Sequence, residues 1–312
     1  IVDNINLGVK WNMMLSLRYD KINNKLSDIL KDPYDASGEA NFSKVTSRVG
    51  ITYALIEEAN IFANWGQGFL PPATEELAQN PDNFGGFNTH LTYSSSYDFD
   101  LGCRGNLSDN VFYDITGFYL KTENDFDRYR ITDSLRNQET FYRNAGSSNR
   151  FGIEFYSKYS PANFLNLKAA YTYTHFVYTS TNPVQILMDD PNTIKFIKDG
   201  NYLPNSPQHQ LFLDIEYSYH TDFYAGLSIE TQSKTYIDGA NIEAEAADGF
   251  TLFNARVGYY LHLKDYDIEL SVFAKNIGDI KYVAFTEPDP GGNAYQPGSG
   301  REFFGGIKFH FK

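Results

Sequence analysis

Residues 210–230 read QLFLDIEYSYHTDFYAGLSIE, and this stretch decides the fold class. A short His-Thr-Asp turn divides it into two runs. In each run every second residue is apolar, and most of the residues between them are polar. Because successive strand residues point to opposite faces, a period of two is typical of a β-strand with one apolar face. The stretch therefore predicts a β-hairpin whose apolar face carries Leu211, Leu213, Ile215, Tyr217 and Tyr219, then Phe223, Ala225, Leu227 and Ile229.

The same period recurs along the rest of the chain and predicts twelve strands. The segment 111–119 is the least regular, because Phe112 and Phe118 fall on its otherwise polar side. The predicted strands lie at 13–19, 45–53, 61–65, 97–103, 111–119, 151–159, 165–173, 211–219, 223–229, 253–261, 268–274 and 303–311.

The connections between these strands alternate strictly between long and short. The long links span 21–41, 69–92, 123–148, 179–206, 236–249 and 279–299. The short turns lie at 56–59, 106–110, 161–163, 220–222 and 264–266. Long loops at one end and tight turns at the other are the pattern of outer-membrane barrels. The sequence thus predicts an all-β, antiparallel up-and-down transmembrane β-barrel.

Composition agrees with this prediction and excludes other classes. The 312 residues include 26 Lys and Arg against 39 Asp and Glu, a formal charge of −13 that argues against nucleic-acid binding. No run approaches the ~20 apolar residues of a membrane helix. Aromatic residues make up 16%, and Tyr lies near the ends of apolar strand faces, where lipid headgroups would meet its hydroxyl. A soluble β-sandwich is the alternative, but it would not sort its loops by length.

Five segments resemble the C-terminal part of TonB-dependent outer-membrane receptors of the siderophore-receptor type. They are WGQGFLPPATEEL at 65–77, YRNAG at 142–146 with GIE at 152–154, LPNSPQH at 203–209, NIGDIKY at 276–282 and YQPGSGREFFGG at 295–306. The resemblance implies a barrel of about 22 strands, of which this chain would supply about twelve as a single domain over 1–312. It also implies a fragment that lacks the plug domain.

The family resemblance implies transport without covalent catalysis. The cargo would be a ferric siderophore or a similar chelate, the energy would come from the TonB complex through the plug domain, and the location would be the outer membrane of a Gram-negative bacterium. No nucleophile, phosphate-loop or zinc-protease motif is present, so we expect neither an enzyme nor a cofactor. The rival interpretations are a complete 12-stranded passive porin, an outer-membrane barrel enzyme, and a soluble or surface adhesion protein.

Candidate ligand-binding residues lie in the loops and on the predicted wall of the lumen. Tyr236, Phe285 and Tyr295 are aromatic residues of long links, and their rings are predicted to stack on a cationic or neutral chelate. Arg301 and Glu154 are predicted to be wall residues of the lumen, where a structural role is favoured and contact with a ligand is the alternative. No metal site is predicted from the six histidines, which lack ligand spacing.

The long links are acidic. The link 236–249 contains four carboxylates and no Lys or Arg, and we expect it to repel anions and attract cations. Such loops could simply meet the divalent cations that bridge lipopolysaccharide, or bind Ca²⁺ loosely through oxygen ligands. The alternative is that they select a cationic or neutral chelate.

Overall fold

The structure is a computed structural model that describes residues 1–31, 35–82, 85–129, 139–179, 183–190, 192–220, 222–288 and 291–311. Its main feature is one antiparallel sheet of thirteen strands. They are β1 (Val2–Leu7), β2 (Trp11–Leu26), β3 (Gly38–Ile56), β4 (Ala59–Leu70), β5 (Ser94–Ser108), β6 (Val111–Tyr129), β7 (Phe141–Ala162), β8 (Leu165–Tyr178), β11 (His209–Tyr219), β12 (Phe223–Gln232), β13 (Phe250–His262), β14 (Tyr266–Lys275) and β17 (Glu302–Phe311).

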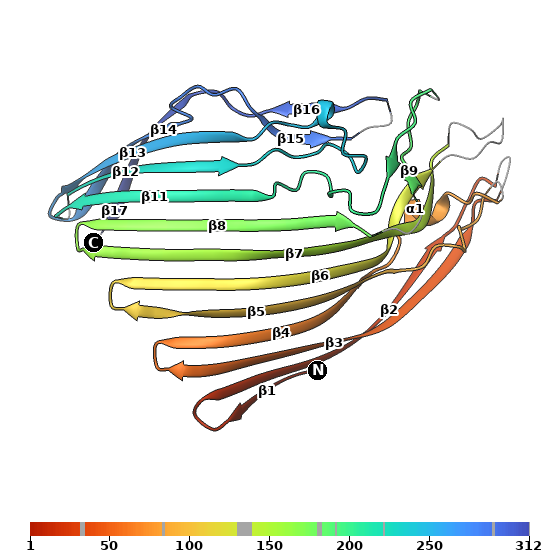
Figure 1. The fold of residues 1–312 in the computed structure, drawn as a ribbon, viewed down its shortest axis with the longest axis horizontal. Coiled ribbons are helices and arrows are strands. Elements are labelled where there is room, and N and C mark those ends of the chain that lie inside the picture. The colour runs from red at the N-terminus through yellow and green to blue at the C-terminus, as the bar shows by residue number, and fades with distance from the viewer. Residues whose placement is uncertain are drawn as a thin grey trace.

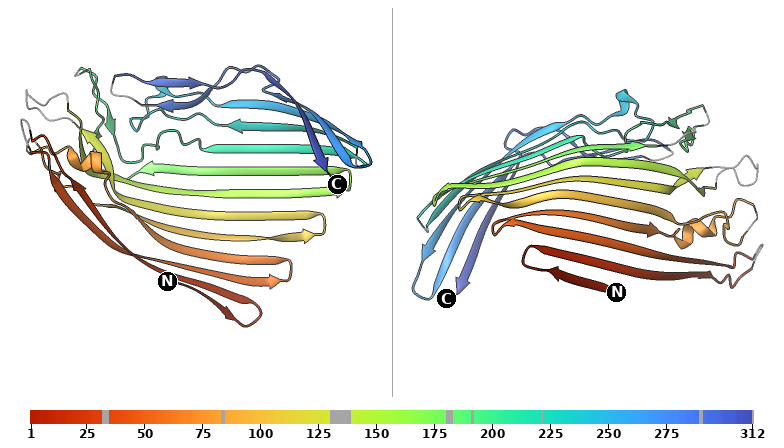
Figure 2. Two further views of the ribbon diagram at one scale, coloured as in Figure 1. Left: turned by 180° about the vertical axis from the view of Figure 1, so that it is seen from behind. Right: turned by 60° about the horizontal axis from the view of Figure 1, so that its bottom comes forward.

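Each strand of the sheet pairs with its neighbours in chain order, so the predicted up-and-down meander is confirmed. The strands run side by side from β1 at one edge to β17 at the other (Figure 1), and the sheet curves into a trough (Figure 2). All thirteen strands lie in this continuous sheet, which is not the architecture of a β-sandwich. Over the described ranges, no ladder joins β1 to β17, so the sheet is not the closed 12-stranded barrel of the porin alternative.

The predicted strand count was one too low because β1 was not recognised. Strand β1 pairs with β2 across a short turn, with Ile5 opposite Met13 and Leu7 opposite Trp11. The alternation is broken at Asp3, which pairs with Leu15 and so lies on the apolar face. A six-residue strand with a carboxylate on that face has too weak a period to be read from sequence.

The remaining elements lie in the long connections. These are the helix α1 (Thr74–Ala78), the hairpin of β9 (Val184–Gln185) with β10 (Phe196–Ile197), the 3₁₀ turn η1 (Glu243–Glu245), and the hairpin of β15 (Val283–Glu287) with β16 (Ala294–Pro297). The described residues contain no helix long and apolar enough to cross a membrane.

One face of the sheet is apolar and exposed, and the other is polar. Leu227, Ile153 and Val272 on the apolar face are 61%, 51% and 52% exposed. On the polar face, Asp214 and Ser228 are buried among neighbouring side chains. A continuous exposed apolar surface of this kind is typical of a wall that meets lipid.

On the apolar face, aromatic residues lie toward both ends of the strands. Trp11 and Tyr53 contact each other near the short turns, with ring centroids 4.4 Å apart. Tyr19 is eight residues along β2 from Trp11, which is about 26 Å at ~3.3 Å per residue. Allowing for strand tilt, this span is close to the height of an outer-membrane apolar band with its two aromatic girdles. The high aromatic content of the chain thus has a structural explanation.

The long connection after β4 has a small core of its own. Leu77 of α1 is fully buried against Phe42, Phe87 and Leu91. The N-terminus of α1 is closed by Glu76, whose carboxylate accepts the backbone N–H of Ala73 at 2.8 Å. This connection is therefore a packed structure at the long-loop end of the strands.

Adjacent alanines on β8 offer a matched test of the two faces. Ala169 pairs with Leu213 on the apolar face, and Ala170 pairs with Phe212 on the polar face. We expect Ala169→Arg to lower the free energy of unfolding in lipid vesicles by about 2–4 kcal/mol, because it places a cation near the centre of the apolar band. Ala170→Arg should cost less than about 1 kcal/mol, since it projects into a hollow on the polar face that Thr172, Gln210 and Glu230 also line. Equal costs, measured by urea titration, would contradict the assignment of the faces.

Candidate functional site

The predicted ligand-facing residue Tyr236 lies among other side chains in the connection between β12 and β13. Its ring stacks on Tyr202, with centroids 6.1 Å apart and planes 16° apart, and the Lys234 ammonium lies 5.2 Å from its centroid. Its hydroxyl donates to Glu243 at 3.1 Å. Tyr236 is thus held within a cluster of aromatic and charged groups, and its ring is half-buried.

The other two predicted aromatic residues lie on the β15–β16 hairpin. Thr286 pairs with Tyr295, and Phe285 pairs with Gln296. Because neighbouring strand residues point to opposite faces, Phe285 and Tyr295 lie on opposite faces of this hairpin. The Tyr295 hydroxyl donates to the Glu245 carbonyl at 2.8 Å, while Phe285 is 55% exposed. Of the two rings, Phe285 is the more available to a ligand.

Arg301 lies at the entry to β17, where two of the sequence motifs meet. Its backbone N–H donates to Asp279 at 2.9 Å, and Asn276 donates to the Ser299 carbonyl at 3.0 Å. The Tyr282 ring occupies the space beside Gly298, where an added Cβ would approach it to 2.0 Å. These contacts explain why position 298 is a glycine. They also explain why the two motifs occur together, because both form the tight turn through which the chain enters β17.

Glu154 lies on the polar face of β7, paired with Thr116 and Thr172. It is exposed on the sheet, away from the two connections that hold Tyr236 and Tyr295. The structure therefore brings Tyr236 and Tyr295 to the same 3₁₀ turn, η1, through Glu243 and Glu245, and leaves Glu154 on the wall.

The expected cation-attracting character of the link 236–249 is weakened by lysines from outside it. Lys195 pairs with Asp238 at 3.0 Å and with Glu245 at 2.5 Å, and Lys234 pairs with Glu243. The hydrogen bond from Lys234, with that from Tyr236, lowers the pKa of Glu243. The two ammonium groups thus offset two of the four carboxylate charges and leave the cluster with a net charge of −2. The two lysines precede the acidic run in the chain, so they were not associated with it from the sequence, and the attraction of cations by this link stays a prediction.

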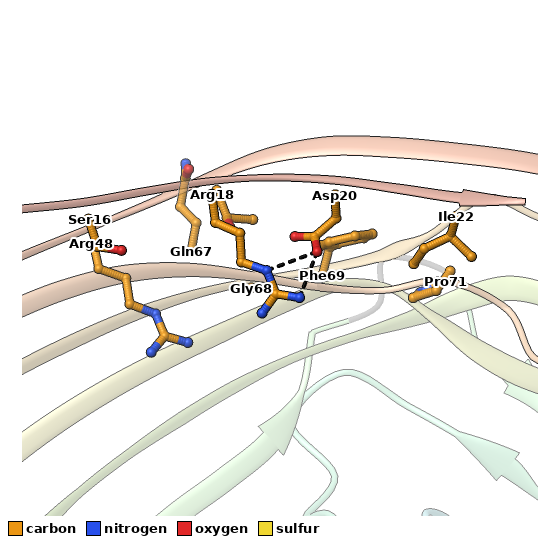
Figure 3. A pocket seen from close by; sticks show the side chains of 10 residues that line it. Ser16, Arg18, Asp20, Ile22, Arg48, Gln67, Gly68, Phe69 and Pro71 are labelled. Atoms are coloured by element: carbon orange, nitrogen blue, oxygen red, sulfur yellow. Dashed lines mark hydrogen bonds and ion pairs between the residues drawn. The ribbon is translucent and has the colours of Figure 1, made fainter. Parts of the chain in front are cut away.

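A hollow of about 430 Å³ lies on the polar face of β2–β4. The guanidinium groups of Arg18 and Arg48 point to the same side of the wall, and Arg18 pairs with Asp20 at 2.6 Å (Figure 3). The stem of Arg48 lies beside Gly66, where an added Cβ would meet it at 3.4 Å, an ordinary contact distance. Sequence analysis did not single out these arginines, although both fall in the polar register of their strands.

A second cluster on the polar face crosses three strands. Arg256 of β13 donates two hydrogen bonds to Asp214 of β11, at 2.6 and 3.0 Å, and two to Glu216, at 2.7 and 3.3 Å. It reaches them across β12 because Gly226 lies between, where an added Cβ would come within 2.5 Å of the guanidinium carbon. This cluster ties neighbouring strands together.

Residues 1–277 match the family model described as TonB dependent receptor-like, beta-barrel. The chain belongs to this family. The resemblance inferred from the five motifs is therefore confirmed.

Relatives of known structure share the fold of this TonB-dependent receptor barrel. The probable TonB-dependent siderophore receptor PiuA of Acinetobacter baumannii is 24% identical over 286 residues, which cover 90% of this chain and 36% of that protein. The crystal structure of PiuA superposes with a TM-score of 0.75 at 21% identity, covering 99% of this chain and 42% of PiuA. The unliganded ferric citrate transporter FecA gives a TM-score of 0.74 at 18% identity, covering 97% and 43%. The chain thus spans about two-fifths of the length of these relatives.

A comparison of Arg256 with Arg301 tests whether an arginine paired with a buried carboxylate contributes more to stability than an exposed arginine. Arg256→Met should lower the free energy of unfolding by about 3 kcal/mol, because Asp214 would stay buried with the more distant Lys168 ammonium, at 4.0 Å, as its remaining cation. Arg301→Met, which removes an exposed side chain, should change it by less than about 0.5 kcal/mol. Both values follow from urea titration in lipid vesicles. A larger effect at Arg301 than at Arg256 would contradict these roles.

Proposed function

We propose that the intact protein containing this chain is an outer-membrane receptor that imports a ferric chelate of the siderophore class, with energy from the TonB complex. The observation that carries the proposal is the match of residues 1–277 to the TonB-dependent receptor barrel. Two relatives support the choice of cargo, since one is described as a siderophore receptor and the other as a ferric citrate transporter.

In this proposal the chain supplies one part of the barrel wall. The apolar face meets the hydrocarbon layer, and its aromatic residues meet the headgroups of lipid and lipopolysaccharide. The polar face, with Glu154 and the arginine hollow, lines the aqueous lumen. Contact with TonB belongs to a plug domain in the rest of the protein, and no covalent step is required of this chain.

The chelate meets the long connections first. Phe285 offers an exposed ring on the β15–β16 hairpin, and Tyr236 and Tyr295 contribute to the surface beside η1. Because Lys195 and Lys234 offset two of the four nearby carboxylate charges, charge alone does not restrict the cargo to cations. Ring stacking and shape then decide which chelate is bound.

Iron uptake tests the proposal directly. The intact receptor would be produced in an outer membrane that lacks other ferric-chelate receptors, and supplied with radiolabelled iron as ferric citrate, a ferric trihydroxamate or a ferric tricatecholate. We expect saturable uptake of at least one of them, abolished when TonB is deleted. Uptake that does not saturate and does not require TonB would contradict the proposal and favour a passive pore.

The aromatic contact can be tested in the same assay. Phe285→Ala should raise the half-saturating concentration of the transported chelate by about 2–10-fold, the range expected for loss of an aromatic contact. Ile29→Ala, which truncates an exposed apolar side chain in the connection between β2 and β3, is the matched control and should leave it unchanged. Equal effects of the two substitutions would argue against a specific role for Phe285.

A further inference from the structure

Lys195 is a buried charged residue in the connection between β8 and β11. Its side chain is only 6% exposed, as is that of its partner Asp238. Its ammonium group also donates to Glu245 at 2.5 Å. Burial opposes its charge, but the hydrogen bonds from Lys195 to Glu245 and Asp238 outweigh this effect and raise its pKa. The residue therefore remains a cation enclosed by two carboxylates.

The two carboxylates connect Lys195 to two further connections of the chain. Asp238 and Glu245 lie between β12 and β13. Glu245 in turn receives a hydrogen bond from Asn293 at 2.8 Å, and its carbonyl receives one from Tyr295 at 2.8 Å. Asn293 and Tyr295 lie between β14 and β17. One buried ammonium group thus stands at the junction of three connections.

Asparagine side chains join the same three connections at other points. Asn241 donates to the Tyr202 carbonyl at 2.9 Å and accepts the Tyr202 N–H at 2.5 Å. Asn205 donates to the Thr286 carbonyl at 2.7 Å and accepts both the N–H and the hydroxyl of Thr286. Asn205 and Asn241 have positive φ values of 52° and 57°, which asparagine tolerates better than most residues. Each asparagine side chain therefore forms hydrogen bonds that hold two connections together, as backbone groups do between paired strands.

Apolar packing closes the junction. Ile237, next to Asp238, is 2% exposed, and Ala247 is 5% exposed. Gly239 lies so close to Ile197 and Tyr178 that an added Cβ would approach their side-chain atoms to 2.8 and 2.9 Å. Buried side chains surrounded by hydrogen bonds favour one arrangement over many, because any displacement would leave polar groups unpaired.

We propose that the described residues of the connections 179–208, 233–249 and 276–301 form one preorganised unit, the C-terminal cap, and that Lys195 is its positioning residue. Lys195 acts through Glu245 and η1 on Tyr236 and Tyr295, so it sets where the receptor presents these rings. The part of the proposal that concerns the ligand rests on the proposed function. The claim that the three connections form one unit does not depend on the proposed function.

Hydrogen exchange of the intact receptor in lipid nanodiscs tests the cap without any ligand. In Lys195→Met, which keeps an unbranched side chain only one atom shorter and removes its charge, amide exchange should rise at least about tenfold in peptides from all three connections together. The strands β8, β11 and β13 should be unaffected. Lys195→Arg, which keeps the charge, should restore most of the protection, and Lys198→Met, at an exposed lysine three residues away, should change nothing.

Two outcomes would overturn the proposal. Faster exchange confined to the connection that contains Lys195 would mean that the three connections are held independently. Unchanged exchange in Lys195→Met would mean that Lys195 positions nothing. If that variant fails to reach the folded receptor, as judged by heat-modified electrophoretic mobility, Glu245→Gln provides the second variant, and it must loosen the same three connections.

Uptake separates positioning from a general structural role. With whichever of ferric citrate, the ferric trihydroxamate or the ferric tricatecholate is transported, Lys195→Met should raise the half-saturating concentration at least about fivefold and leave the maximal rate per folded receptor unchanged. A fall in the maximal rate alone would contradict positioning. If none of these chelates is transported, the proposed function fails, while the exchange experiment still decides whether the cap is one unit.

Discussion

The backbone groups of this chain constrain everything else in its structure. In a hydrocarbon layer no water can satisfy an N–H or C=O group, so a chain that crosses the layer as strands must pair each strand with its neighbours. The thirteen-stranded ladder does this from β1 to β17. Pairing in turn fixes the side-chain alternation, so that one residue in two faces lipid and the next faces the polar side. A slip of one residue would exchange the two faces completely.

The two faces are held together by different forces. On the apolar face the side chains gain their burial from lipid, which is why Leu227 and Val272 are exposed in the protein alone. On the polar face, hydrogen bonds between side chains of different strands stabilise the sheet. An example is the hydrogen bond from Arg256 to Asp214 across Gly226. In the described connections the ladders are short, as in the β9–β10 and β15–β16 hairpins. Order there comes from small cores such as that around Leu77 and from the buried charge of Lys195.

The fold was predictable because it depends on a local signal. Residues two apart share a face, so 210–230 alone shows both the strands and the turn between them, and the alternating link lengths show the polarity. Strand β1 escaped because Asp3 interrupts that signal. The loop contacts were not predictable in the same way, since Lys195 meets partners 43 and 50 residues away with no period to indicate them. For Tyr236, Phe285, Tyr295, Arg301 and Glu154, the structure gives positions, and their roles toward a ligand stay predictions.

The most direct test of the central claim is a spin-label scan of β11 in the intact receptor, reconstituted in lipid bilayers with Cys103 replaced by serine. Single cysteines introduced at 210–217 would be labelled, and collisions with oxygen and with a water-soluble nickel chelate measured. The account predicts that oxygen accessibility peaks at Leu211, Leu213, Ile215 and Tyr217, and that nickel accessibility is higher at the residues between them. Accessibility without a period of two, or with the opposite phase, would contradict the assignment of the apolar face to lipid.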